Sequence, residues 1–428
     1  MVDPAFRATQ KAFFQSLRDR PLDLLDAEDR KLYEPLHDDD HDPVKRLLDT
    51  VEFSGTESVQ LVAGFRGTGK TTEFSRLEKD LWEAGHIVIR VNLDEYVDMH
   101  SSVDIRDFLL IVAGAISDKL TSDRLLGKDK GLEKSFWERL QNILSTNIQA
   151  KEATVKTPAG DLKLALQSDA DFRERVRNAF SGRLEQLVND VRTHHRKVLE
   201  ALRERHGPNA RLVVILDSLE HLRGSVERAE MVRRSVEEMF FTHGQRIGLP
   251  DTHMIISVPA FLAVKADNLA AQFMNGKVEA WPAYRVVDRR GQRTEVVDRI
   301  VRLVKRRGRW DLMLPNQAAL EQLIMASGGH LRDLFNMLIE AIHLAGRGVL
   351  PNAADKVVSV ARRAYMPLYK DEIAVLRRVA MTQGLQDLEG KEREYVLRFL
   401  DAGLLLCYLN DDFWYDVHPL VKNVVLGT

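Results

Sequence analysis

The feature that most constrains this chain is a glycine-rich segment, GFRGTGKT, at residues 64–71. It satisfies the pattern G-x-x-x-x-G-K-[ST]. An apolar run at 59–63, typical of a buried strand, precedes it, and a helical pattern that ends near residue 84 follows. Loop glycines let backbone N–H groups surround phosphate oxygens, and the following helix directs its positive end toward them. The segment therefore predicts a P-loop that binds a nucleoside triphosphate, which we expect to be ATP.

The polar residues of this loop have expected roles. Lys70 would reach the β- and γ-phosphates, and the Thr71 hydroxyl would hold Mg²⁺. We expect the nucleotide to contact Gly64, Arg66, Gly67, Thr68, Gly69, Lys70, Thr71 and Thr72.

A second apolar run, RLVVILDSL at 211–219, ends a strand in an aspartate. Asp217 would then lie at the carboxyl edge of the sheet, where the P-loop also opens, and would hold the Mg²⁺ water shell. Hydrolysis needs a residue that orients or deprotonates water, most commonly a glutamate directly after this aspartate, but here Ser218 follows. Glu220 is the replacement that we favour, the alternative being a surface helix residue. Ser257, in MIISVPAF, either senses the γ-phosphate or simply ends a strand.

Two other groups of residues have open interpretations. In SGGHLRDL, at 327–334, Arg332 stands in the first turn of a predicted helix, where it opposes the helix dipole. It would contact nucleotide phosphate and contribute to catalysis, or it forms an ordinary salt bridge, and the adjacent His330 is more often structural. Ten basic residues also lie within 285–309. They form a solvated helix face, contact a neighbouring subunit's nucleotide, or contact nucleic-acid phosphate.

The rest of the chain predicts an α/β fold with a mostly parallel, helix-covered sheet. Apolar residues at helical spacing over 172–202 predict one helix of about 30 to 35 residues. A helix followed by a hairpin at the end of the chain has the layout of a winged helix. The other predicted strands are 86–93, 212–216, 254–258, more weakly 283–287, and a short pair within 153–166. The other predicted helices are 5–18 and 395–402, and two further segments are helical, 294–307 and 316–346, the second divided into two helices by Gly328 and Gly329. The hairpin strands are 404–409 and 413–417.

Composition excludes several classes of protein. With 428 residues, two or three domains are expected. No run of 18 apolar residues predicts a membrane span, and the single cysteine, Cys407, excludes an intramolecular disulfide, so we expect a cytoplasmic protein. A formal net charge of −2 gives no overall attraction to nucleic acid.

These motifs resemble those of the STAND and origin-recognition-like branch of AAA+ ATPases. The matching segments are GFRGTGKTT, VVILDSLEHL, SGGHLRDL and LLLCYLNDDFWYDVHPLV, and the resemblance spans 51–100 and 208–428. It implies that Lys70 and Thr71 are the P-loop pair, Asp217 the Mg²⁺ aspartate and Arg332 the lid arginine. The implied domains are an N-terminal helical arm at 1–50, a P-loop core at 51–287 with a helical insertion at 101–207, a helical lid at 288–350 and a winged-helix domain at 351–428.

The resemblance also implies a function. Such proteins in bacteria serve as ATP-driven switches that self-assemble and regulate a partner protein, many of them in anti-phage defence. No effector domain is recognisable, so an effector would be a separate protein. The alternatives are a DNA-binding ATPase similar to replication initiators or transposition regulators, and a scaffold that binds nucleotide without hydrolysing it. Residues 356–428 contain ten Lys or Arg and ten Asp or Glu, so nucleic acid is not favoured.

Overall fold

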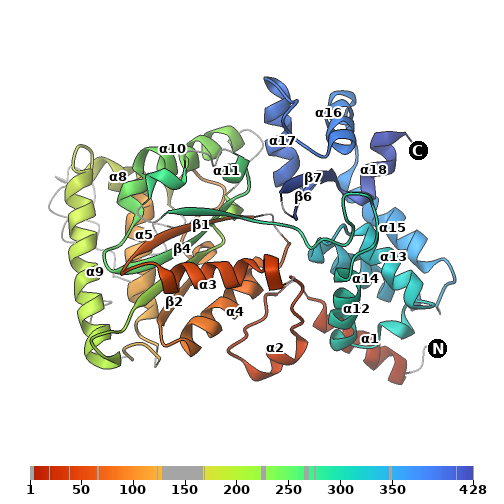
Figure 1. The fold of residues 1–428 in the computed structure, drawn as a ribbon, viewed down its shortest axis with the longest axis horizontal. Coiled ribbons are helices and arrows are strands. Elements are labelled where there is room, and N and C mark those ends of the chain that lie inside the picture. The colour runs from red at the N-terminus through yellow and green to blue at the C-terminus, as the bar shows by residue number, and fades with distance from the viewer. Residues whose placement is uncertain are drawn as a thin grey trace. The chain divides into compact units, whose positions relative to one another are not determined.

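The structure is a computed structural model, and its described residues form an α/β fold (Figure 1). They are 4–18, 20–37, 39–64, 67–122, 124–127, 167, 169–222, 228–264, 269–273, 276–346, 349–410 and 412–427. They divide into two compact units. The first comprises Met1–Val44, Gly64–Arg76 and Ala280–Thr428, and the second comprises Lys45–Ala63 and Leu77–Glu279.

The sheet has five strands in the order β2-β3-β4-β1-β5. The strands are β1 (Ser58–Gly64), β2 (Ile87–Asn92), β3 (Leu212–Asp217), β4 (Thr252–Pro259) and β5 (Lys277–Trp281). Every residue of β1, β3 and β4 is buried, as expected for central strands covered on both faces. β3 runs parallel to β2 on one side and to β4 on the other, and Asn92 is in register with Asp217. The predicted α/β fold class is confirmed.

The strand predicted at 283–287 is wrong, because the fifth strand is β5, which ends at Trp281. Pro282 follows and has no N–H to donate to a ladder. The apolar residues that follow Pro282 (Ala283, Tyr284 and Val286) are buried in apolar clusters outside the sheet. The Ala283 N–H donates to the Cys407 carbonyl (2.8 Å), and Val287 forms only an isolated bridge with Arg293.

Helices of the second unit pack around the sheet. They are α3 (Pro43–Phe53), α5 (Ile105–Lys119), α8 (Ala170–Ala179), α9 (Leu184–His206), α10 (Ala229–Ile247) and α11 (Phe261–Val264). The single helix predicted over 172–202 is wrong, because the chain breaks between α8 and α9 at Gly182, where φ is +69°. The apolar spacing continues across the break because both helices pack against α5. The pair of strands predicted within 153–166 lies outside the described residues.

Two buried histidines lie near the start of β4. The His195 Nε2 is 2.7 Å from the Thr252 Oγ1, and the His253 Nδ1 is 2.9 Å from the Ser58 Oγ. Both rings are almost completely inaccessible to solvent. Burial lowers the pKa of each histidine to about 4, so both are neutral at pH 7.

Most of the first unit is helical. Its elements before the C-terminal segment are α1 (Pro4–Ser16), α2 (Ala27–Leu32), the start of α4 (Lys70–Glu83), α12 (Val296–Arg307), α13 (Gln317–Ala326), α14 (Leu331–Ala345) and α15 (Ala353–Arg362). α12, α13, α14 and α15 share one apolar core, to which Phe13 of α1 also contributes. Gly308 ends α12 with φ at +151°, and a Cβ there would lie 2.9 Å from the Phe13 ring.

The C-terminal segment has the helix, helix, hairpin order of a winged helix. Its elements are α16 (Lys370–Thr382), α17 (Lys391–Asp401), β6 (Leu405–Leu409), β7 (Phe413–Val417) and α18 (Pro419–Leu426). The two strands are antiparallel, and the rings of Tyr408 and Trp414 stack with centroids 4.5 Å apart. Cys407 is buried in β6, and burial raises the pKa of its thiol to about 12.

Candidate nucleotide-binding site

The P-loop connects β1, which ends at Gly64, to α4, which begins at Lys70. Gly67 and Gly69 have φ values of +78° and +83°, in the left-handed region that favours glycine. Phe65 and Arg66 lie outside the described residues, and so does the contact predicted for Arg66. The local arrangement is that of a strand, a glycine-rich turn and a helix.

Close packing explains two of the loop glycines. A Cβ at Gly64 would lie 2.6 Å from the Cδ of Lys70 and 2.7 Å from the Cβ of Trp281. The aliphatic part of Lys70 therefore folds back over the start of the loop. A Cβ at Gly67 would overlap the His330 imidazole and would lie 2.9 Å from the Cβ of Arg332. Any larger residue would displace the lysine at Gly64 and the start of α14 at Gly67.

The turn between α13 and α14 contacts the P-loop through the backbone. The Arg332 N–H donates to the Gly67 carbonyl (3.3 Å). Gly328 and Gly329 both have positive φ, and a Cβ at Gly329 would overlap the Tyr284 backbone. The first turn of α14 therefore lies against the loop that we expect to bind phosphate. This places Arg332 beside the P-loop, while its contact with nucleotide stays a prediction.

The N-terminal arm contacts the helix that follows the P-loop. The Leu22 N–H donates to the Thr72 Oγ1 (3.1 Å), and the Leu24 N–H donates to the Ser75 Oγ (2.8 Å). The Thr72 hydroxyl is thus engaged within the protein, so a contact between Thr72 and nucleotide would come from its backbone N–H. Thr71, in the same turn, is only partly buried.

The residues predicted around the second motif lie in the other compact unit. Asp217 ends β3 and is buried, and its Oδ1 accepts the Ser218 N–H (2.8 Å). Ser218 has φ at +77°, an uncommon conformation for a residue with a side chain. A 3-10 turn, Leu219–His221, follows directly.

Glu220 and Ser257 are in contact. The Ser257 hydroxyl donates to the Glu220 Oε2, and both side chains are buried. Glu220 is therefore not a surface residue, contrary to the alternative considered for it from sequence. Ser257 lies within β4 rather than at its end, on the strand paired with β3. The two residues that we selected separately as base and sensor form one hydrogen-bonded pair.

Most arginines on α12 contact the N-terminal arm. Arg302 and Arg306 both form ion pairs with Glu34, at 2.7 and 2.8 Å. Arg299 donates to the His37 carbonyl, and the buried Arg307 donates to the Ser16 carbonyl (2.6 Å). Two other arginines of the basic segment 285–309 lie just outside α12: Arg293 pairs with Asp298 and Glu321, and Arg309 pairs with Asp311. None of the three interpretations from sequence included this intramolecular role.

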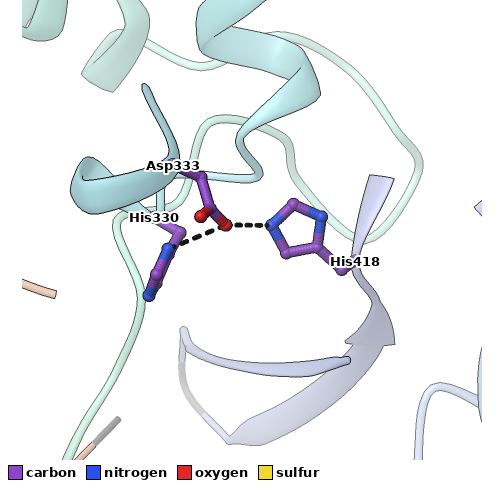
Figure 2. A group of neighbouring side chains, drawn as sticks. All are labelled: His330, Asp333 and His418. Atoms are coloured by element: carbon purple, nitrogen blue, oxygen red, sulfur yellow. Dashed lines mark ion pairs between the residues drawn. The ribbon is translucent and has the colours of Figure 1, made fainter. Parts of the chain in front are cut away.

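A cluster that sequence reasoning missed includes His330, which packs against Gly67 of the P-loop. Figure 2 shows three of its members, His330, Asp333 and His418. We call His330, Asp333, Tyr365 and His418 the Asp333 cluster. The Asp333 Oδ2 lies 2.9 Å from the His330 Nδ1 and 3.0 Å from the His418 Nε2, and it accepts the Tyr365 hydroxyl (2.5 Å). Burial alone would raise the pKa of Asp333, but the two neighbouring histidines hold it well below its ordinary value.

Comparisons with known proteins gave structural likenesses only. No family model and no curated protein matches the chain. Similar solved structures include the Aeropyrum pernix ORC2 protein in its ADPNP–ADP complexes, at 13% identity and a TM-score of 0.41, covering 93% of this chain and 98% of that one. A Walker-type ATPase of Pyrococcus abyssi is 14% identical, with a TM-score of 0.42, and covers 96% and 99%. Cdc6p from Pyrobaculum aerophilum is 13% identical, with a TM-score of 0.38, and covers 93% and 97%. Separately, no helix in the described residues is long and apolar enough to cross a membrane.

Proposed function

We propose that this chain is an ATP-dependent switch of the P-loop class, which binds ATP with Mg²⁺ and hydrolyses it. The observation that supports the proposal best is the bond from the Arg332 N–H to the Gly67 carbonyl. It joins the loop expected to hold the phosphates to the helix expected to respond to them. A change at the P-loop backbone would therefore be transmitted directly to α14.

We also propose that Mg²⁺ accompanies the nucleotide. Oxygen atoms are the ligands that Mg²⁺ prefers, and the sequence offers a hydroxyl at Thr71 and, in the other unit, a carboxylate at Asp217. Mg²⁺ would neutralise charge on the phosphates, and Lys70 would add a charged hydrogen bond to them. The positive end of α4 would favour the same anion.

The Glu220–Ser257 pair supports hydrolysis. A carboxylate held by a neighbouring hydroxyl has a defined orientation, which a general base needs. The first acidic residue after Asp217 is Glu220, in the turn that follows Ser218. If the wild-type protein binds ATP but does not hydrolyse it, the chain is the non-hydrolysing scaffold that we considered as an alternative.

The switch requires two states with different affinities for ATP, because equal affinities would shift no equilibrium. We propose that ATP favours self-assembly and a contact with a separate partner protein. Anti-phage defence remains part of this proposal on the basis of the sequence resemblance alone. The DNA-binding alternative is not favoured, since Arg299, Arg302, Arg306 and Arg307 all contact the N-terminal arm.

Calorimetry with Lys70→Ala tests the proposal. Loss of a charged phosphate contact should weaken ATP binding at least tenfold, or about 1.4 kcal/mol. Lys79→Ala is the matched control, because Lys79 lies on the same helix and pairs only with surface carboxylates, Asp80 and Glu83, among the described residues. Equal ATP affinity in wild type and Lys70→Ala, with both proteins folded by circular dichroism, would refute the proposal.

A further inference from the structure

The proton positions in the Asp333 cluster can be assigned from its contacts. The His418 Nδ1 accepts the Leu420 N–H (3.2 Å) at the start of α18, so this nitrogen carries no proton. Burial lowers the pKa of His418 despite the opposing effect of Asp333, which leaves the ring neutral. Its one ring proton must then be on Nε2, which faces the Asp333 Oδ2 at 3.0 Å. His418 is therefore a neutral ring whose Nε2 is in close polar contact with this carboxylate.

The same logic orients His330. Its Nδ1 lies 2.9 Å from the Asp333 Oδ2, so one ring nitrogen faces this carboxylate. The other ring nitrogen, Nε2, would overlap a Cβ placed at Gly67, so the ring lies directly against the P-loop. His330 is buried, and the backbone of the next two residues is fixed by the bond from Arg332 to Gly67. Asp333 thus fixes the ring orientation of the side chain that packs on the P-loop.

One carboxylate oxygen consequently connects three segments that are far apart in the sequence. His330 belongs to the turn against the P-loop, Tyr365 follows α15, and His418 is the N-cap of α18 in the winged-helix segment. The Tyr365 ring also stacks on the His418 ring, with centroids 4.8 Å apart. All of these residues lie in one compact unit.

We propose that Asp333 is a positioning residue that couples the P-loop to α18: it holds His330 against Gly67 and holds the first turn of α18 through His418. This inference rests on the proposed function, because it takes nucleotide to be the ligand of the P-loop. Phosphates bound there would contact the loop backbone on which His330 packs. Since His330 cannot move without altering its contact with Asp333, occupancy of the loop changes the stability of the first turn of α18.

Amide hydrogen exchange of residues 420–426, measured by mass spectrometry with and without ADPNP and Mg²⁺, tests this coupling. In the wild type we expect the analogue to change the exchange rate there by at least about threefold. Asp333→Asn keeps the shape of the side chain but removes its charge. It should speed exchange in the nucleotide-free protein about tenfold and abolish the response, while ADPNP affinity stays within about threefold of wild type. Asp371→Asn, which alters an exposed aspartate at the start of α16, should behave as wild type.

The outcomes separate this inference from the proposed function. If the wild type binds no nucleotide, the proposed function fails, but the nucleotide-free comparison still tests the cluster. Unchanged exchange in nucleotide-free Asp333→Asn, or a full response in that variant, would overturn the coupling. Tyr365→Phe provides a milder variant, since it removes one hydrogen bond and keeps the ring, and it should give a smaller acceleration of the same sign.

A metal ion is the competing explanation, because ligand atoms of His330, Asp333 and His418 lie within 4.8 Å of one another. The proton on the His418 Nε2 blocks that nitrogen as a ligand. Zinc content and exchange rates should therefore be the same before and after treatment with EDTA. One equivalent of zinc that is retained by the wild type and lost in Asp333→Asn would overturn the metal-free assignment of this cluster.

Discussion

Acidification should destabilise the second unit through His195 and His253. Each histidine has a pKa near 6.5 when unfolded and about 4 when folded. Above pH 6.5 both states are neutral and the full stability is present. As the pH falls from 6.5 toward 4, the unfolded chain takes up protons and the folded chain does not, so stability is lost. Below pH 4 both states are protonated and the effect of these groups is constant.

The size of the effect follows from the two pKa values. At 1.36 kcal/mol per pKa unit, one such histidine should lower the free energy of unfolding by about 2 kcal/mol between pH 8 and pH 5. Two independent groups give about 4 kcal/mol, a large part of the roughly 5–15 kcal/mol typical of a domain. The loss of stability can be measured by equilibrating the protein in urea at each pH and then labelling it with a brief deuterium pulse at one fixed pH. Mass spectrometry of peptides from β4 then gives the fraction of molecules in which the second unit, which contains both histidines, is unfolded.

The test is a comparison of pH dependences. The double variant His195→Gln, His253→Asn keeps polar groups near Thr252 and Ser58 but cannot titrate in this range. It should be less stable than wild type at pH 8 and should lose about 4 kcal/mol less between pH 8 and pH 5. His343→Gln, which alters an exposed histidine on α14, should keep the wild-type dependence. If the double variant loses as much stability as wild type, the two buried rings are not the groups that titrate.

Two further predictions concern the proposed reaction. Glu220→Gln should leave ATP binding intact and slow hydrolysis about a hundredfold or more, since a positioned base contributes about 10² to 10⁴; steady-state phosphate release near the wild-type rate would assign the base elsewhere. Arg332→Ala should reduce the protection from proteolysis that ATP induces more than it reduces ATP affinity. The expected reason is that the Arg332 side chain stabilises the ATP-bound position of α14, whereas the variant keeps the backbone bond to Gly67. Equal ATP-induced protection in variant and wild type would argue against a lid role.

Much of the fold could be predicted because its signals are local. Apolar runs bounded by glycine, proline or charged residues predicted the ends of β1 to β4 to within two residues of the observed ends. The P-loop was predictable because its glycine pattern lies between a strand signal and a helix signal in the sequence. The two errors have local causes as well. Gly182 interrupts a helix without interrupting its apolar spacing, and the mixed composition of β5 gives no periodic signal.

The candidate site was predictable in its separate parts but not in their pairing. Glu220 and Ser257 were each selected from a strand position, and their hydrogen bond depends on the pairing of β3 with β4. The ion pairs of Arg302 and Arg306 depend on Glu34, which lies far away in the sequence. No spacing rule joins such residues, because only the tertiary fold brings them together.

Cys407 gives the molecule a practical property. It is the sole cysteine in the sequence, it is buried between paired strands, and a pKa of about 12 leaves almost no thiolate at pH 7. Maleimides should therefore react with it slowly in the native protein. Cysteines introduced at exposed positions could then carry fluorophores with little background labelling and without removal of the native residue. The slow reaction of Cys407 itself would record transient opening of the C-terminal hairpin.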